Sequence, residues 1–157
     1  MMRMKLVAVT TAAVTLLAAT GASHADKLED AVKARQSYYQ VVKFNAGPLF
    51  AMMKGSMDYA AETAQTHADN LRTLTALKNG AMWPKGSSKS DLPGKTRALA
   101  AIWEAGSTVG EKGADFRKAV AELAEVAGQG KDAMVPKVRA LGASCSACHK
   151  EYRAKEF

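Results

Sequence analysis

Residues 132–152 read DAMVPKVRALGASCSACHKEY, and the order of side chains in this stretch predicts a long helix close to the end of the chain. Apolar and small residues recur in it at spacings of four and three, which is the pattern of an amphipathic helix. They are Met134, Val138, Leu141, Cys145, Cys148 and Tyr152. Pro136 falls in the first turn, where proline is tolerated. The two cysteines are therefore expected on the same face as the core residues.

Within this stretch, Cys145-Ser146-Ala147-Cys148-His149 has the C-x-x-C-H spacing of a c-type haem attachment site. Helical residues three apart share a face, so both sulfurs can reach one edge of a porphyrin. His149 follows directly and can ligate the iron as the proximal ligand. The chain has 2 cysteines in all, so no thiol is left for a separate disulfide. The sequence predicts one covalently bound haem c.

Two other uses of paired cysteines remain open. A thioredoxin-like dithiol has the same C-x-x-C spacing, but it sits in a βαβ unit, and no strand pattern occurs here. A closed zinc site needs four ligands. Beyond Cys145, Cys148 and His149, the chain after residue 25 offers only the remote His67 as a further histidine. Haem attachment is the favoured interpretation.

Three further segments have helical periodicity, at 28–53, 59–78 and 113–127, and a short helical turn is expected at 97–104. The inward side chains of the first segment are expected to be Leu28, Val32, Arg35, Tyr39, Val42, Ala46, Leu49 and Met53. Pro48 should kink this helix or interrupt its hydrogen bonds near Phe44. No segment alternates with period two. We therefore expect an all-α, antiparallel up-and-down four-helix bundle, with the haem attached to the C-terminal helix.

The N-terminus has the pattern of a secretory signal. Arg3 and Lys5 precede an apolar run, and Ser23-His24-Ala25 supplies small residues for cleavage after Ala25. We expect residues 1–25 to be a signal peptide, residues 26–157 to be one haem domain, and the periplasm to be its location. No membrane span is expected after signal removal.

Charge says little about partners. Without Arg3 and Lys5 the net charge falls from +7 to +5, which fits a solvated surface. Nucleic acid is not expected, because export removes it from reach and no basic stripe is present. Lys85, Lys89 and Lys95 in the long loop can steer an acidic partner, although loop lysines are more often simply solvated.

Side chains of the first helix are candidates to cover the haem. Arg35 occupies a core position, where a charge is costly unless it is paired. A haem propionate is its favoured partner, and the alternatives are snorkelling to solvent or an ion pair with a neighbouring acid. Tyr39, one turn on, would stand over the porphyrin face, or else pack in the core. His67 is read as a boundary residue with a satisfied hydrogen bond, rather than as a second axial ligand.

Several motifs resemble the cytochrome c′ family, the class II c-type cytochromes, over residues 26–157. They are Arg35-Gln36-x-x-Tyr39, Lys54-Gly55, Thr96-Arg97, Ile102-Trp103 and Cys145-x-x-Cys148-His149-Lys150-Glu151-Tyr152-Arg153. The resemblance implies a bacterial periplasmic haem protein that is often a homodimer formed through its first two helices. Pro48 departs from the usual pattern of the family.

The resemblance also implies roles for matching residues. Cys145 and Cys148 would be the thioether links, and His149 the axial iron ligand. Arg153 would flank the proximal face, Arg35 and Gln36 would contact the haem with Arg35 at a propionate, and Tyr39 would lie at the distal position.

The distal residue bears on the chemistry. A neutral phenol such as Tyr39 is a poor iron ligand. Met52, Met53 and Met57 follow it by 13 or more residues, about 20 Å along a helix, and should not reach the same iron. We therefore expect a five-coordinate, high-spin iron.

Three functions follow from these expectations. The first is single-electron transfer with periplasmic redox partner proteins. The second is binding of small gases (NO or CO), and the third, less favoured, is an exported dithiol oxidoreductase. No general base, nucleophile or substrate pocket is recognisable, so an enzyme is not expected.

Overall fold

The computed structural model describes the backbone of residues 17–157 and the side chains of residues 25–157. Four α-helices form its frame. They are α1 (Leu17–Lys54), α2 (Ala61–Thr75), α3 (Val109–Ala124) and α4 (Lys131–Tyr152). Two short 3₁₀ turns, η1 (Asn79–Met82) and η2 (Ala100–Trp103), lie in the long segment between α2 and α3.

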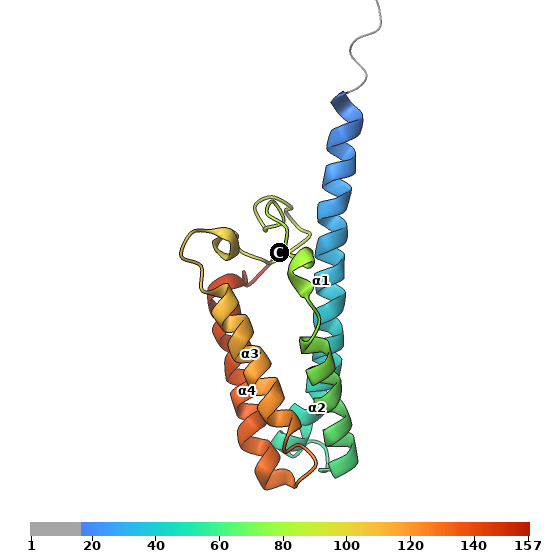
Figure 1. The fold of residues 1–157 in the computed structure, drawn as a ribbon, viewed down its shortest axis with the longest axis vertical. Coiled ribbons are helices and arrows are strands. Elements are labelled where there is room, and N and C mark those ends of the chain that lie inside the picture. The colour runs from blue at the N-terminus through green and yellow to red at the C-terminus, as the bar shows by residue number, and fades with distance from the viewer. Residues whose placement is uncertain (1–16) are drawn as a thin grey trace, which may run out of the picture.

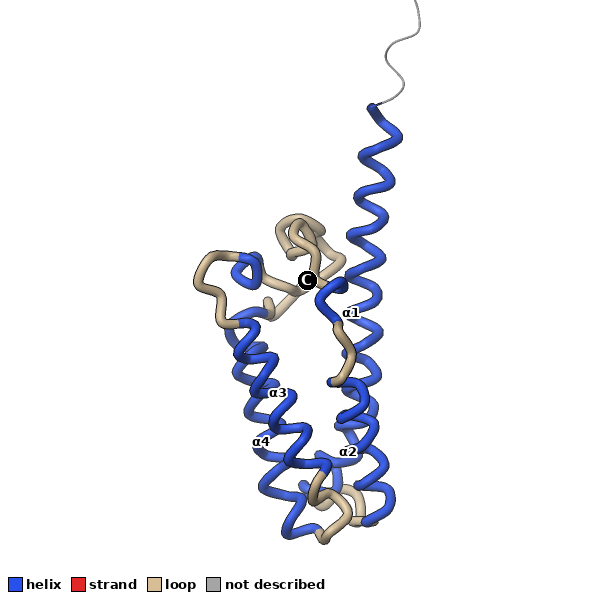
Figure 2. Tube along the Cα trace, viewed as in Figure 1, coloured by secondary structure: helices blue, strands red, loops and turns tan. Residues whose placement is uncertain are grey.

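The helices lie side by side in two pairs, α1 with α2 and α3 with α4 (Figures 1 and 2). The long segment between α2 and α3 gathers at one end of the bundle beside the C-terminus, and the N-terminal part of α1 projects beyond that end (Figure 1). In the described part of the chain the only bridge-type pairing is the one between Ala98 and Arg153. The predicted all-α four-helix bundle is confirmed.

Helix boundaries differ from the sequence expectation where glycine is involved. The helix expected at 113–127 begins earlier, at Val109, and ends earlier, at Ala124. Gly110 and Gly113 lie inside α3, because an isolated glycine weakens a helix without ending it. Gly55, by contrast, does end α1: its φ of +77° is the left-handed conformation that a helix C-terminus favours.

The buried stripe of α1 shifts by one position at two points. Val32, Val42 and Leu49 are buried as predicted. Tyr38 and Met52 are buried in place of the predicted Tyr39 and Met53. An α-helix has about 3.6 residues per turn, whereas alternating spacings of four and three average about 3.5 residues. A stripe predicted from those spacings therefore drifts away from the true inner face along a long helix.

Pro48 does not end α1, which continues to Lys54. Proline lacks only its own N–H, so the expected interruption is confined to the carbonyl of Phe44, four residues earlier. Nearby, the Asn45 side chain donates from Nδ2 to the carbonyl of Val41 at 3.0 Å. The helix is long and well packed on either side of Pro48, which allows it to pass through.

The core lies between the four helices and is built from aliphatic side chains and methionines. Its largest fully buried members are Leu49, Met52, Leu71, Leu123, Met134 and Leu141. Burying such side chains stabilises a fold by about 1.5–3 kcal/mol each. Cys145 packs against the edge of this core, so the core itself fixes the position of the C-x-x-C motif.

Both ends of the bundle are tied by hydrogen bonds between distant segments. At one end, the Tyr59 hydroxyl accepts from Gly130 N and donates to Ala127 O, each at 2.9 Å. At the other, Leu99 N donates to Tyr152 O at 3.0 Å, and Ala154 N to Arg97 O at 2.8 Å. The second set anchors the long α2–α3 segment against the end of α4.

The expected signal peptide falls largely on residues 1–16, which lie outside the described residues; from Leu17 the backbone is helical. Within the described part of the chain, no helix combines the length and apolar character needed to cross a membrane.

Candidate functional site

The two cysteines lie one turn apart on α4, both partly buried and both free. Burial raises the pKa of the Cys145 thiol, and burial also raises that of Cys148, with Glu151 adding to the shift. Both thiols are therefore protonated at neutral pH. They form no disulfide with each other, so both sulfurs are available for thioether bonds.

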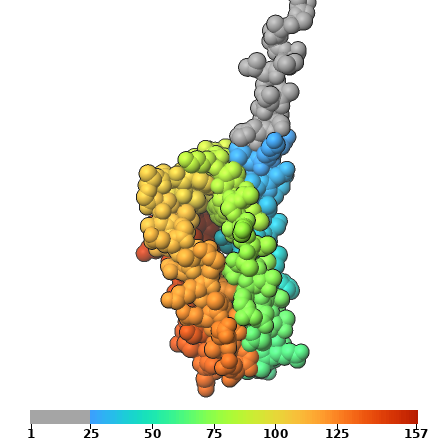
Figure 3. All heavy atoms as spheres, viewed as in Figure 1, coloured from blue at the N-terminus to red at the C-terminus, as the bar shows by residue number. Residues whose placement is uncertain are grey.

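A hollow opens on the face of the bundle that Figure 3 shows. The green segment that follows α2 and the yellow segment that precedes α3 form its rim, and dark red atoms from the C-terminal end of the chain lie at its floor (Figure 3). The end of the bundle that holds the C-x-x-C motif is therefore less filled than the core beneath it.

Tyr39 of α1 lies at the edge of the core rather than inside it. It is 42% exposed, and burial is the first cause that raises its pKa to about 12. The nearby groups Tyr38, Cys148 and Cys145 raise the same pKa further, whereas the charge of Arg35 lowers it.

Arg35 is 3% exposed and is bound by the long loop. Nη1 donates to Ser87 Oγ at 2.7 Å and to Met82 O at 3.4 Å. Nη2 donates to Ser87 O at 2.6 Å and to Thr96 Oγ1 at 2.8 Å. These four bonds use every Nη hydrogen and leave Nε–H as the remaining donor of the guanidinium.

The charge of Arg35 has no counterion among the described side chains, none of whose carboxylates forms an ion pair with it. Its pKa is lowered by burial, with Tyr39 acting in the opposite direction. Neither snorkelling nor an ion pair with a neighbouring acid, the two alternatives considered from sequence, occurs. A buried cation without an anion is costly, so this end of the bundle suits a bound group that carries carboxylates.

His149 is exposed on the last turn of α4, and its Nε2 lies 3.4 Å from Nη1 of Arg153. Burial lowers its pKa, and the positive charges of Arg153 and Arg97 lower it further. The neutral imidazole is therefore favoured at pH 7, which is the form that ligates metals. Arg153 itself is exposed and pairs in backbone with Ala98.

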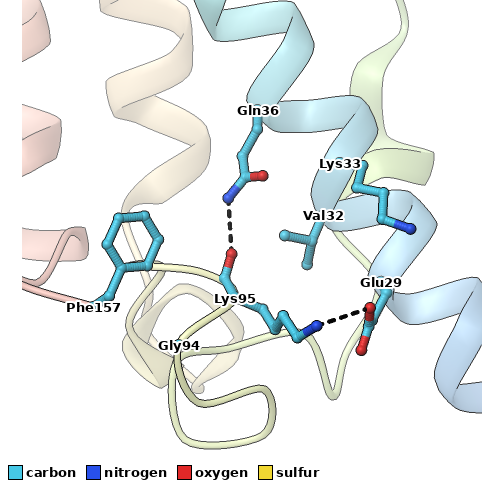
Figure 4. A pocket seen from close by; sticks show the side chains of 7 residues that line it. All are labelled: Glu29, Val32, Lys33, Gln36, Gly94, Lys95 and Phe157. Carbon is cyan, nitrogen blue, oxygen red and sulfur yellow. Dashed lines mark hydrogen bonds and ion pairs between the residues drawn. The ribbon is translucent and has the colours of Figure 1, made fainter.

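Gln36 is exposed and lines a cavity of about 360 Å³ where α1 meets the loop and the C-terminus (Figure 4). Its Nε2 donates to Lys95 O at 2.8 Å, and Lys95 Nζ lies 3.4 Å from Oε2 of Glu29. The cavity is lined by Glu29, Val32, Lys33, Gln36, Gly94, Lys95 and Phe157. Neither Tyr39 nor a cysteine lines this cavity.

His67 lies away from the motif, against α1. Its Nδ1 is 3.1 Å from Oδ1 of Asn45, and its ring meets Phe44 edge-on at 6.2 Å. The interpretation of His67 as a boundary residue with a satisfied hydrogen bond agrees with this geometry.

The contacts of loop residues with Arg35 were the part of the site that sequence reasoning missed. Ser87 and Thr96 are buried with 0% and 3% exposure and hold Arg35. Trp83 lies under the Arg35 guanidinium, with 4.7 Å between its ring centroid and Cζ. Nothing in their sequence spacing links these residues to Arg35, since the link comes from the path of an irregular loop. Two of the loop lysines are engaged: Lys89 Nζ donates to Glu156 O at 2.7 Å, and Lys95 pairs with Glu29.

The arrangement fits haem c. Two free thiols lie on one helical face, and a neutral histidine follows them. A hollow opens at the same end of the bundle, and the buried guanidinium of Arg35 pairs with no described carboxylate. Each of these features matches a requirement of a covalently held, carboxylate-bearing porphyrin.

Comparisons with known proteins agree with this fit. A family model described as cytochrome c′ matches residues 30–153. A cytochrome c′ of Cereibacter sphaeroides is 39% identical over 142 residues, which cover 90% of this chain and 95% of that protein.

Solved structures give the same result. A cytochrome c′ from Rhodobacter has a TM-score of 0.79 at 39% identity and covers 82% of this chain and 98% of its own. A ferrous variant of cytochrome c′ from Alcaligenes xylosoxidans with bound NO has a TM-score of 0.70 at 29% identity, with 82% and 97% covered. The chain therefore belongs to the cytochrome c′ family, whose members are c-type cytochromes with one covalently attached haem c.

Proposed function

We propose that this protein is a periplasmic single-electron carrier with a five-coordinate, high-spin haem. The observation that carries the proposal is the phenol of Tyr39, a poor ligand, on α1 near the two thiols of α4 that precede His149. A phenol whose pKa is raised to about 12 stays protonated at neutral pH and does not ligate. Haem iron with His149 as its one axial ligand would change its oxidation state without losing a ligand.

Each proposed site residue has a distinct task. Cys145 and Cys148 anchor the porphyrin through thioether bonds, and His149 ligates the iron. When bound, the haem supplies the one-electron chemistry. Arg35 balances a propionate with a buried charge that no described carboxylate neutralises.

Two further residues act around this centre. Arg153 flanks the His149 imidazole, whose pKa is lowered first by burial and then by the charges of Arg153 and Arg97. Gln36 follows Arg35 directly in the sequence, and we propose that it contacts the haem beside that residue.

Export and assembly complete the proposal. Residues 1–25 are removed as a signal peptide, and residues 26–157 act in the periplasm with redox partner proteins. A homodimer through α1 and α2 is supported by apolar side chains that α1 leaves exposed, Phe44 at 72% and Val41 at 45%.

A second function, gas binding, is favoured by the same vacant coordination position. A small neutral molecule such as NO or CO can reach iron that no side chain ligates on the Tyr39 side. A structural neighbour, the Alcaligenes xylosoxidans variant, is described with bound NO. Electron transfer is preferred because it needs no displacement of Tyr39.

Absorption spectra of the purified native protein test the proposal. We expect a Soret band, a ferric high-spin spectrum and a ferrous spectrum without the features of a sixth ligand. Ferrous protein mixed with CO or NO then tests the second function. A low-spin ferric spectrum would contradict five-coordination, and a protein with two titratable thiols and no Soret band would favour the dithiol oxidoreductase.

Tyr39→Met tests whether Tyr39 covers the distal side. Methionine sulfur is an established axial ligand of c-type haem, so the variant is expected to shift the haem toward low spin. Phe44→Met serves as the control, because Phe44 is 72% exposed and should leave the spectrum unchanged. If the Tyr39→Met spectrum equals that of the wild type, Tyr39 is not the distal residue.

A further inference from the structure

Tyr39 is held between two other aromatic rings. Its ring centroid lies 5.0 Å from that of Tyr38, at an interplanar angle of 84°. On another side it lies 6.3 Å from Trp83, at 78°. Both are edge-to-face arrangements, which are favourable aromatic contacts. Tyr39 cannot turn away from its position without breaking one of them.

The two contacts differ in how firmly they are held. Tyr38 is 7% exposed, and its hydroxyl donates to Leu74 O at 3.3 Å. It therefore belongs to the core and moves only with it. Trp83 belongs to the irregular segment between η1 and η2, and such segments open locally at a lower free-energy cost than packed helices. Displacement of Tyr39 is therefore expected on the Trp83 side.

Trp83 is itself locked in place by contacts with two residues. The Arg35 guanidinium lies over its ring at 4.7 Å, a favourable cation–π distance. Trp103 donates from Nε1 to Trp83 O at 3.0 Å, with its ring centroid 6.3 Å away. Since Arg35 is bonded to Ser87 and Thr96 of the same loop, the indole has a defined position rather than a range of them.

We propose that Trp83 is a positioning residue that holds the Tyr39 ring in place through their edge-to-face contact and so slows the entry of small neutral ligands on the distal side. The proposed function assigns Tyr39 to the distal side, and this inference adds what keeps Tyr39 there. Arg35 then acts on the same process through Trp83, independently of any propionate. Ligand entry requires Tyr39 to swing, and Tyr39 swings only when its contact with Trp83 breaks.

The first test is the rate of CO association with the ferrous holoprotein, measured by stopped flow. Trp83→Leu is expected to raise this rate about 3–10-fold, the factor that corresponds to one aromatic pair. Trp83→Phe keeps an aromatic edge and should restore a rate close to that of the wild type. Lys89→Ala is the matched control, since it removes an anchor of the same loop, the bond from Lys89 Nζ to Glu156 O, that does not involve Trp83. If Lys89→Ala accelerates binding as much as Trp83→Leu, general loosening of the loop explains the effect and the proposal is overturned.

A coupling test separates action through Tyr39 from a direct effect of Trp83. In a Tyr39→Leu background, Trp83→Leu should add no further acceleration, because the ring that it positions is gone. If the fold-increases in the CO association rate caused by the two substitutions multiply instead, Trp83 acts independently of Tyr39 and the inference fails.

A readout without gas keeps this inference distinguishable from the proposed function. Ultraviolet absorption is measured as a function of pH to follow ionisation of the Tyr39 phenol. The titration of the same protein with Tyr39→Phe is subtracted, so that the other tyrosines cancel. Burial raises the pKa of Tyr39 to about 12, so removing the covering indole should lower it. The pKa of Tyr39 could fall in Trp83→Leu while the wild-type protein fails to bind CO. That pair of results would reject the proposed gas access but support the positioning role. An unchanged titration together with an unchanged CO rate would reject the positioning role itself.

Discussion

Replacing Cys145 and Cys148 together by alanine is expected to abolish covalent haem attachment. Cys145 and Cys148 are the only cysteines in the chain, and both thiols are free on one face of α4. The polypeptide purified from a cytochrome c-maturing host should then have the mass of its amino acids alone, and denaturation should release any haem that remains bound.

Single substitutions and a flanking control make this experiment more specific. Each single variant, Cys145→Ala or Cys148→Ala, retains one thioether position and should give reduced yield or an altered spectrum rather than the full loss. Ser144→Ala combined with Ser146→Ala changes the neighbouring side chains of the same turns and should leave the haem attached. Covalent haem in the double cysteine variant would contradict the assignment of the site.

His149→Gly is expected to leave the haem attached while removing the nitrogen ligand of the iron. The covalent links come from Cys145 and Cys148, so the mass should still include the haem. Both the ferric electron paramagnetic resonance signal and the Soret band should change, because His149 is the histidine adjacent to the motif. Added imidazole, which fits the vacated space, should restore the wild-type spectra.

The matched control is His67→Ala. His67 bonds to Asn45 at 3.1 Å and lies on α2, so this variant should lose about 1 kcal/mol of stability, typical of one hydrogen bond, with an unchanged spectrum. A His67→Ala variant that alters the axial-ligand signal, or a His149→Gly variant that does not, would reverse the roles of the two histidines.

The sequence was informative where chemistry depends on spacing along one helix. The motif around Cys145 and Cys148 and the periodicity of α4 predicted the face on which both thiols lie, because residues three and four apart meet on any helix. The same rule was less exact over the longer α1, where Tyr38 rather than Tyr39 is buried. That shift matters, since it puts Tyr39 at the edge of the core, where it is 42% exposed.

Arg35 shows the opposite case. Its position in the apolar stripe of α1 predicted burial, and it is 3% exposed. Its partners could not be foreseen, because Ser87 and Thr96 lie 52 and 61 residues away along the chain. A buried guanidinium needs acceptors, but a sequence does not say which segment will fold over it.

The amino-acid sequence by itself determined the four amphipathic helices, the thiol pair and the histidine next to it, since periodicity and spacing are local properties of a chain. Only the tertiary structure decided that Tyr39 is wedged between Tyr38 and Trp83, and that Arg35 is held by a loop rather than by an acid. Such contacts join residues from an irregular segment to a helix, and their geometry follows from how the loop closes over the end of the bundle. The residues that anchor the haem thus all belong to one helix, while access to the distal side of the haem depends on how the loop packs.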